Sequence, residues 1–399
     1  MTTEKIIVKN FGPIREADLD LRKVTVFIGE QASGKSVLAK LITMFQDITL
    51  LQDRAQNDRR WWKAKLAYYN LDDFFKKDSQ IEYESKDFTA KITANGGFAV
   101  KYHNKRLKYL VDNISIQEKK QDEIDANSRK AYEINDFSKA AELEVTKGIA
   151  LSEIIKLRSE LKISFFDSIY VPAERILLSF APFINYDDFY LSDFILQFQE
   201  KRKLKKKFNI KTLDIEYNYD EDSDDFENKI KLKKNNVVLS LHKTASSIQS
   251  LVPLHVFIET INPLMKYSFV IEEPELNLYP TTQKKLVEYL IEKCTQGENR
   301  LIITTHSPYV LTALNNLIQA KNVVKNRPEL TDDVTQIIPP QYHLDFEDVA
   351  AYFVADGTVH SIMNTDNQLI DANALDEVSN ELSDEFGKLV QLEFQDLAI

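Results

Sequence analysis

The chain has 399 residues, of which 43% are hydrophobic, 28% charged and 11% aromatic, and its formal net charge is −11. This composition excludes a disordered chain, because burial of so much apolar surface offsets the entropy lost on ordering, and the acidic balance gives no support for wholesale coating of nucleic acid. The single cysteine, Cys294, excludes a disulfide framework or a zinc cluster and fits a reducing compartment.

Hydrophobic segments are short throughout the sequence. None reaches the roughly 18 residues of a membrane span, and residues 1–10 lack the apolar core of a signal peptide. We therefore expect a cytoplasmic protein that does not insert into a membrane.

The first 51 residues alternate strand and helix patterns. Short β-branched or alternating runs predict strands at 4–11, 17–21 and 23–28, the last of which ends at Gly29. Apolar residues at helical spacing then predict a helix over 36–51.

Residues 52–162 have a different character. A helix is predicted over 58–70, and 80–111 alternates as strands do, around a hairpin turn at Asn95-Gly96-Gly97. Residues 117–162 are polar, lack proline and predict one or two long helices, but their heptad pattern is too weak for an extended coiled coil. We expect an inserted β-hairpin and helical arm.

The α/β pattern returns at residue 163. Strand patterns are found at 163–172, 267–271 and 300–304, and helix patterns at 181–207, 246–261, 281–294 and 308–317. Such alternation predicts a largely parallel sheet. We expect one discontinuous α/β domain over 1–51 and 163–362, interrupted by 52–162, and an amphipathic helical segment over 363–399 that either packs on its own chain or docks on a partner.

A glycine-framed loop stands between the third strand and the first helix. Gly29-Glu30-Gln31-Ala32-Ser33-Gly34-Lys35-Ser36 fits the pattern G-x-x-x-x-G-K-S. In such loops the backbone amides converge on phosphate oxygens, and the following helix adds its positive N-terminal end. Lys35 would reach the β and γ phosphates, and Ser36 would bind Mg²⁺. The expected nucleotide-binding residues are Gly29, Gln31, Ala32, Ser33, Gly34, Lys35 and Ser36.

Two later strands end in polar side chains. The strand before Glu272 and Glu273, and the strand before His306, would place these groups at the sheet edge that carries the loop. Glu272 would hold Mg²⁺ through a water molecule, Glu273 would act as general base on the attacking water, and His306 would bond to the γ phosphate or that water. Taken alone, paired glutamates are usually a solvated turn and a lone histidine is usually structural, but their order after the loop favours catalysis.

The order of these motifs resembles the ABC-type ATPase heads, and most of all the stand-alone bacterial ATPases related to SMC and OLD (overcoming lysogenization defect) proteins. The resemblance spans roughly residues 1–50 and 165–360. The segments that carry it are Lys9–Ile14, the phosphate loop, Tyr170–Arg175, Ala245–Gln249, Ile271–Leu276 and Thr304–Pro308. It implies an α/β fold of the P-loop NTPase class with an ABC-type head, and ATP and Mg²⁺ as cofactors.

The resemblance also implies a composite site, in which the signature segment of one copy closes over ATP held by another. Ser246 and Ser247 stand at the signature position, where Ser246 would donate to the γ phosphate, unless it is a plain helix N-cap. Ser247 replaces the usual glycine, and Glu272 replaces the aspartate of most ABC proteins. Gln46 and Gln52 compete for the Gln-loop position.

OLD-family nucleases continue into a Toprim domain, whose clustered carboxylates hold two metal ions. After His306 the carboxylates Asp345, Glu347, Asp348 and Asp356 follow no E-G-x-x-E and D-x-D pattern. We expect no nuclease activity in this chain, and a separate nuclease or toxin as effector.

The resemblance thus implies a soluble ATPase that forms a homodimer or larger homo-oligomer and regulates an effector, in DNA-linked processes or in antiphage defence, as do the ATPase subunits of systems such as Septu and PARIS. The alternatives are a nucleotide-gated scaffold with little turnover and a transporter ATPase subunit. Two smaller questions stay open. Lys201–Lys207 either contacts DNA, RNA or an acidic partner, or is a solvated helix end; Arg175 either reaches the nucleotide or dimer interface, or forms an internal salt bridge.

Overall fold

The computed structural model describes residues 4–47, 51, 59–92, 97–183, 189–205, 207–219, 228–371, 385 and 388. Several sequence predictions fall outside these residues: the turn at Asn95 and Gly96, Gln52, Lys206 and most of the C-terminal helical segment.

A large mixed sheet organises the described residues, with strand order β6-β5-β4-β1-β2-β15-β14-β3-β13-β12-β7. Its strands are β1 (Glu4–Phe11), β2 (Ile14–Leu21), β3 (Val24–Ile28), β4 (Phe75–Glu84), β5 (Phe88–Ile92), β6 (Phe98–Tyr102), β7 (Phe166–Val171), β12 (Lys266–Glu272), β13 (Arg300–Thr305), β14 (Val349–Ala355) and β15 (Thr358–Ser361).

The prediction of a largely parallel sheet is correct only for the central strands. β7, β12, β13, β3 and β14 are parallel neighbours. From β2 through β1 and β4 to β6 the strands pair antiparallel, because hairpins instead of helical crossovers join most of them. The strands expected within the insertion therefore continue the sheet that carries the phosphate loop.

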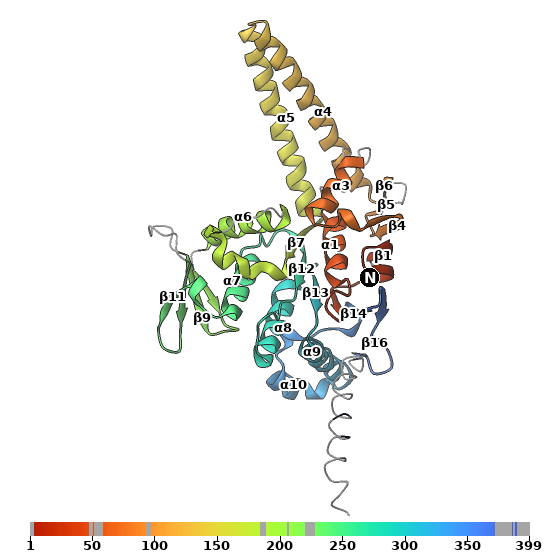
Figure 1. Ribbon diagram of the computed structural model, residues 1–399, viewed down its shortest axis with the longest axis vertical. Coiled ribbons are helices and arrows are strands. Elements are labelled where there is room, and N and C mark those ends of the chain that lie inside the picture. Colours follow the sequence, from red (N-terminus) through yellow and green to blue (C-terminus); the bar gives the residue numbers. More distant parts are fainter. Residues whose placement is uncertain are drawn as a thin grey trace, which may run out of the picture.

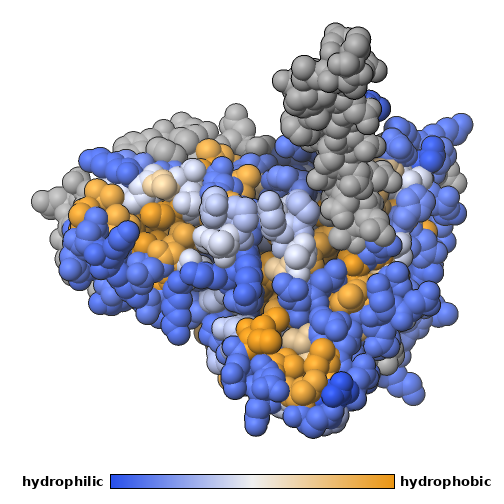
Figure 2. All heavy atoms as spheres, turned by 90° about the horizontal axis from the view of Figure 1, so that it is seen from below, coloured by the Kyte–Doolittle hydropathy of each residue, from blue (hydrophilic) through white to orange (hydrophobic). Residues whose placement is uncertain are grey.

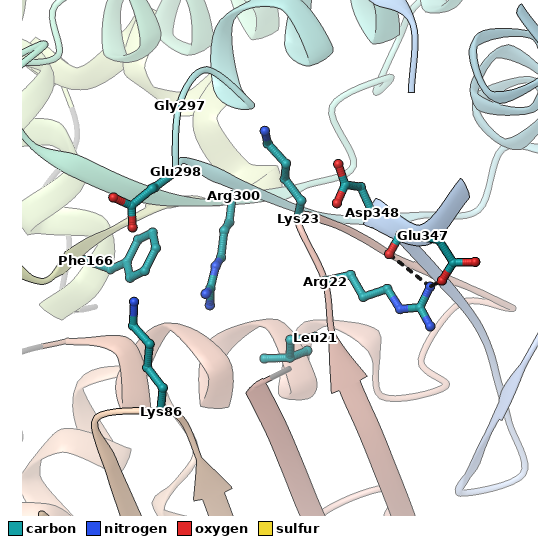
Figure 3. A pocket seen from close by; sticks show the side chains of 10 residues that line it. All are labelled: Leu21, Arg22, Lys23, Lys86, Phe166, Gly297, Glu298, Arg300, Glu347 and Asp348. Atoms are coloured by element: carbon teal, nitrogen blue, oxygen red, sulfur yellow. Dashed lines mark hydrogen bonds and ion pairs between the residues drawn. The ribbon is translucent and has the colours of Figure 1, made fainter. Parts of the chain in front are cut away.

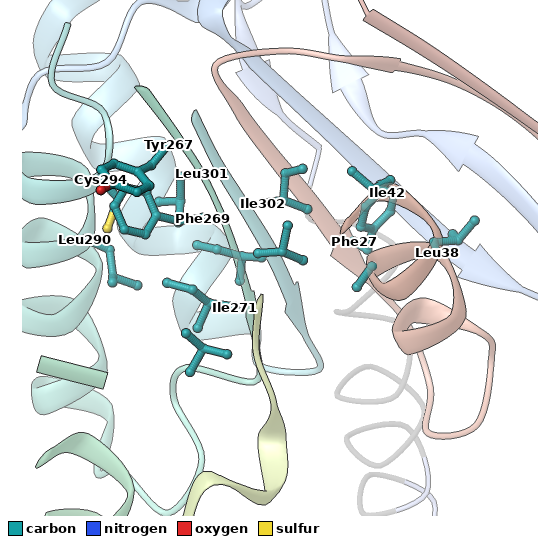
Figure 4. Packing of buried hydrophobic residues seen from close by; sticks show 14 of the residues in the cluster. Phe27, Leu38, Ile42, Tyr267, Phe269, Ile271, Leu290, Cys294, Leu301 and Ile302 are labelled. Atoms are coloured by element: carbon teal, nitrogen blue, oxygen red, sulfur yellow. The ribbon is translucent and has the colours of Figure 1, made fainter. Parts of the chain in front are cut away.

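Helices cover both faces of the central strands. α1 (Lys35–Gln46) lies on one face, and α8 (Pro280–Cys294) and α9 (Pro308–Asn326) lie on the other. Figure 4 shows Leu38 and Ile42 of α1 beside Phe27, while Leu290 and Cys294 of α8 pack near the other face. Strands buried on both faces read as continuous apolar runs, which is why β3 and β12 are recognisable in the sequence.

Two long helices form the arm, α4 (Lys105–Glu133) and α5 (Phe137–Ser164), after the shorter α3 (Arg59–Tyr68). They project from the body as an antiparallel pair (Figure 1), about 43 Å long at 1.5 Å per residue. Ion pairs join them, such as Arg158 to Glu118 at 2.6 Å and Lys147 to Asp125 at 2.7 Å. The two helices agree with the prediction over 117–162.

Residues 105–111, predicted as strand, belong to α4 instead. The Asn104 side chain accepts hydrogen bonds from the backbone N–H groups of Arg106 and Leu107, which caps the helix. Leu107, Leu110 and Val111 are buried at helical spacing, and this short run is compatible with either period.

A second, four-stranded sheet lies beside α6 (Phe189–Leu204) and α7 (Ser246–Glu259) in Figure 1. Its order is β11-β10-β9-β8. Its strands are β8 (Lys207–Ile210), β9 (Ile215–Tyr219), β10 (Asn228–Leu232) and β11 (Val238–Ser240). A 3₁₀ segment, η3 (Ala173–Phe183), connects β7 to this region.

The predicted helical segment over 363–399 is wrong for its first residues. β16 (Met363–Asn364) and β17 (Leu369–Ile370) form a two-stranded antiparallel sheet. The Asn364 side chain accepts from the backbone N–H groups of Asp366 and Asn367, which makes a local turn. Asn315 of α9 bonds to both backbone groups of Ile370. α10 (Thr331–Ile337) lies on the chain between α9 and β14.

No helix in the described part of the chain is long and apolar enough to cross a membrane. On the face seen in Figure 2, hydrophobic side chains gather in separate patches within a hydrophilic surface.

His255 joins α7 to the second sheet and to α8. Its Nε2 lies 3.2 Å from Thr212 Oγ1, and its ring centre lies 4.1 Å from that of Tyr289. Burial lowers the pKa of His255 from 6.5 to about 3, although the Glu259 charge opposes this. Because the folded-state pKa is lower than the unfolded value, the neutral ring contributes stability above pH 6.5 that is lost as the pH falls toward 3.

We expect the titration of His255 alone to lower the free energy of unfolding by about 2 kcal/mol as the pH falls from 7 to 5. Urea unfolding of wild type and His255→Gln at both pH values measures this difference, with the exposed His103→Gln as control. Equal pH dependence in wild type and His255→Gln would contradict the prediction.

Candidate nucleotide site

The phosphate loop connects β3 to the N-terminus of α1. Gly29 and Gly34 adopt φ angles of 154° and 107°, which favour glycine. A β-carbon at Gly29 would lie 2.2 Å from the backbone oxygen of Val354, and one at Gly34 would lie 2.5 Å from Ile14 Cδ1. Neighbouring strands thus leave no room for side chains at these two positions, and the loop follows a tight backbone path.

Lys35 begins α1 and turns its ammonium back over the loop. Its Nζ donates to the backbone oxygens of Gly29 at 2.8 Å and Glu30 at 2.5 Å. Burial lowers the pKa of Lys35, and the charges of Glu273, Glu275 and Glu272 oppose this shift. The loop therefore holds a buried cation within electrostatic range of three carboxylates from a distant part of the sequence.

Strand order explains how these groups meet. β13 lies between β3 and β12, and all three run parallel, so their carboxyl ends share one edge. In the register, Glu272 is opposite Thr304, and Thr305 is opposite Ile28. The structure thereby brings together the predicted residues of the loop, the acidic strand and His306.

Glu273 and His306 form a pair at this edge. His306 Nδ1 lies 3.4 Å from Glu273 Oε1, and both side chains are partly exposed. The backbone of Glu273 has a φ of 41°, and its N–H donates to the backbone oxygen of Thr304 at 2.9 Å. This conformation costs energy in a non-glycine residue, and the hydrogen bond to β13 helps to hold it.

Glu272 is the last residue of β12 and is nearly fully buried. Burial raises the pKa of Glu272 to about 7, opposed by the Lys40 charge and by the Tyr170 and Ser36 hydroxyls. Among the described residues, the buried Glu272 Oε1 and the Tyr170 hydroxyl interact, but neither makes a hydrogen bond of good geometry. Such oxygens beside Ser36 are a donor set suited to Mg²⁺ and its water molecules, since Mg²⁺ prefers oxygen ligands.

The sequence matches the AAA ATPase domain family over residues 1–168 and 189–311. The chain belongs to this family. No curated protein matches it by sequence.

Among solved structures, those similar to this AAA ATPase include SMC head domains and a recombination mediator protein. They are the Smc head domain with an extended coiled coil bound to the C-terminal domain of ScpA from Pyrococcus furiosus (13% identity, TM-score 0.38, 95% of this chain and 100% of that chain), the SMC head domain from Thermotoga maritima (12%, 0.40, 91% and 98%) and the recombination mediator protein RecF (12%, 0.32, 91% and 98%).

Glu275 is a buried carboxylate at this edge that the sequence prediction left without a role. Its Oε1 accepts from the Thr305 hydroxyl and from the backbone N–H of His306 at 3.4 Å. Burial raises the pKa of Glu275. The residue therefore connects the acidic loop, defined as residues 272–275, to the turn at His306. Its place as the third glutamate of Glu272-Glu273-Pro274-Glu275 was the sequence signal that could have revealed this role.

Two sequence interpretations need correction. Arg175 is fully buried, and within the described residues its guanidinium donates to backbone oxygens. It therefore has neither of the two predicted roles, which were a contact with the nucleotide or dimer interface and an internal salt bridge. Gln46 lies at the opposite end of α1 from the loop, where its side chain donates to Glu4 Oε2 at 3.1 Å. It is therefore not a Gln-loop residue beside Ser36.

Ser246 and Ser247 lie in the first turn of α7. Ala245 is the N-cap residue, and no side chain caps this helix, so Ser246 is not the plain N-cap that was the alternative. Ser246 is exposed. Within the described part of the chain, no hydrogen bond joins either serine to the phosphate loop.

The basic run at the end of α6 has local partners. Lys205 lies 3.3 Å from Glu259, Lys207 lies 2.9 Å from Glu216, and the Arg202 guanidinium packs 4.2 Å from the Tyr219 ring centre. These contacts favour the interpretation of this run as a solvated helix end. The contact with nucleic acid stays a prediction.

A cavity of about 660 Å³ lies at the other end of the central strands. Phe166, Arg300 and Lys23 stand at or just before the amino ends of their strands, and Arg22 bonds to Glu347 (Figure 3). The lining of this cavity contains both basic and acidic side chains. The cavity is thus separate from the edge that carries Lys35 and Glu273.

Proposed function

We propose that this AAA ATPase binds ATP with Mg²⁺ and hydrolyses it at a site that two copies complete together. The observation that carries the proposal is the convergence at one sheet edge of the Lys35 ammonium, the buried Glu272 and the Glu273–His306 pair. A basic loop opposite carboxylates fits a ligand that combines phosphate with a divalent cation.

Each residue has a distinct role in the proposed reaction. Lys35 would exchange its bonds to the loop oxygens for bonds to the β and γ phosphates, while Ser36 and Glu272 would hold Mg²⁺. When bound, Mg²⁺ supplies neutralisation of the charge on the phosphate oxygens. Glu273 would accept a proton from the attacking water. At the same time the water oxygen would bond to the γ phosphorus, and the bond between that phosphorus and the oxygen bridging to the β phosphate would break.

His306 would orient this step. Its Nδ1 lies near Glu273, and the Glu275 carboxylate accepts from its backbone N–H. This leaves the opposite edge of the imidazole ring for the water or the γ phosphate. The ring is partly exposed, so a second protein surface is needed to exclude bulk water.

Exposed aromatic residues beside the site support pairing with a second copy. Tyr279, just before α8, is 74% exposed, and Tyr309, in the first turn of α9, is 53% exposed. Tyrosine is enriched at protein interfaces. In the proposed pair, Ser246 and the uncapped start of α7 of one copy would meet the γ phosphate held by the other.

The motif order extends the proposal to a separate effector protein, a nuclease or toxin, whose activity the ATP-driven pairing would control in antiphage defence. DNA or RNA is a further proposed partner.

Light scattering with Mg²⁺ and a slowly hydrolysed ATP analogue tests the pairing. We expect the wild type to double in mass, and the double variant Tyr279→Ser/Tyr309→Ser to stay monomeric and hydrolyse ATP about tenfold more slowly, with analogue affinity within about threefold. Tyr109→Ser on the arm, which is similarly exposed, is the control. A wild type that stays monomeric, or a double variant that pairs normally, would count against the shared site.

A further inference from the structure

Arg175 contacts three separate segments of the chain around the candidate site. Its guanidinium donates to Pro172 at the end of β7, to the acidic loop, and to Ser250 in α7. The five acceptors are the backbone oxygens of Ser250 (3.2 Å), Pro172 (3.1 Å), Glu272 (2.7 Å), Glu273 (2.7 Å) and Pro274 (3.2 Å).

Full burial makes these bonds costly to break. Arg175 has 0% exposure, and a buried cation that loses its acceptors finds no water to replace them. Burial lowers the pKa of Arg175 to about 10, opposed mainly by Glu275 and Glu273, so the guanidinium keeps its charge at neutral pH. Its planar fork donates in fixed directions, and the acceptors are therefore held in one arrangement.

Ser179 makes a second contact from the same 3₁₀ segment, η3. Its hydroxyl lies 3.1 Å from Gln249 Oε1, and Gln249 Nε2 donates to the oxygens of His242 and Thr244. These two carbonyls belong to the loop that leads into Ser246. Thus η3 contacts the acidic loop through Arg175, and the start of α7 through both Arg175 and Ser179.

We propose that η3, through Arg175, links the two ATP sites of the paired protein. The inference rests on the proposed function. In that pair Glu273 acts on ATP bound to its own copy, whereas Ser246 faces ATP bound to the other copy. A shift of the acidic loop on ATP binding moves the Arg175 acceptors, and the same guanidinium moves α7 and Ser246. Arg175 is a positioning residue: it touches the backbone of catalytic groups and no reacting atom.

Hydrolysis rate against ATP concentration tests this link with Arg175→Gln and Arg175→Lys. For the wild type we expect a Hill coefficient between 1.5 and 2, roughly the number of coupled sites. Both variants should show a Hill coefficient of about 1 and a kcat about tenfold lower, with ATP affinity of the monomer within about threefold. Lysine keeps the charge but lacks the planar fork, so it should not restore coupling.

Several controls keep the test decisive. Arg22→Gln, at the opposite edge of the sheet, should behave as wild type. If Arg175→Gln does not fold, Arg175→Lys and Ser179→Ala carry the test, and Ser179→Ala should lower the Hill coefficient without changing ATP affinity. A folded Arg175→Lys with wild-type kcat and Hill coefficient overturns the link, as does a wild type that hydrolyses ATP with a Hill coefficient of 1. A wild type that neither binds nor hydrolyses ATP instead contradicts the proposed function.

Discussion

Replacing Glu273 by glutamine should slow ATP hydrolysis at least about 100-fold and leave ATP affinity within about threefold. Glutamine keeps the size of the side chain and its 3.4 Å contact with the His306 ring, but it does not accept a proton from the attacking water. Phosphate release under saturating ATP measures the rate, and equilibrium binding of Mg²⁺-ATP measures the affinity. The closed, ATP-bound pair should accumulate in the variant and appear in light scattering as doubled mass.

Glu298→Gln is the matched control for this experiment. Glu298 is a partly exposed glutamate at the opposite edge of the sheet, paired with Lys266 at 2.6 Å, and its loss should leave hydrolysis unchanged. If wild type and Glu273→Gln release phosphate equally slowly, hydrolysis is not the mechanism, and a nucleotide-gated scaffold becomes the better account.

Replacing Lys35 by alanine should weaken ATP binding by about 100-fold or more, because a charge-assisted contact to phosphate is lost from a site where water is scarce. ATP with Mg²⁺ should raise the melting temperature of the wild type, since a ligand at 100 times its Kd adds about 2.7 kcal/mol of stability. Under the same conditions Lys35→Ala should show no such rise.

Lys139→Ala on the exposed side of the arm controls for the loss of one positive charge, and it should keep the thermal shift. Unchanged ATP affinity in Lys35→Ala would contradict the assignment of the phosphate loop, and with it the proposed roles of Ser36 and Glu272.

Local patterns predicted much of this protein. The run from Val24 to Ile28 is β-branched and ends at a glycine, so its strand needs no knowledge of its neighbours. Residues 117–162 lack proline and form two helices. By contrast, 105–111 alternates in hydrophobicity well enough to resemble a strand, and the Asn104 cap places it in α4. Short apolar runs fit both periods, and tertiary contacts choose between them.

The antiparallel half of the sheet was harder to predict from the sequence. Nothing in 75–102 says that β4 pairs with β1, because backbone hydrogen bonds between distant strands leave no residue-specific mark. The same reason hid the position of Arg175. Its acceptors are carbonyl oxygens, which every residue carries, so its sequence context left only a choice between a contact with the nucleotide or dimer interface and an internal salt bridge.

The order of residues by itself determined the glycine-framed loop, the helix after it and the strands that lead to Glu272 and His306. Each of these is a contiguous pattern with its own hydrophobic period and its own bounding residues. The tertiary structure alone decided that β13 lies between β3 and β12, so that Lys35 faces carboxylates more than 230 positions away. It also decided that one buried guanidinium joins the acidic loop to α7. Strand neighbours and shared carbonyl acceptors are set by the burial of the whole core, and no short stretch of sequence encodes that.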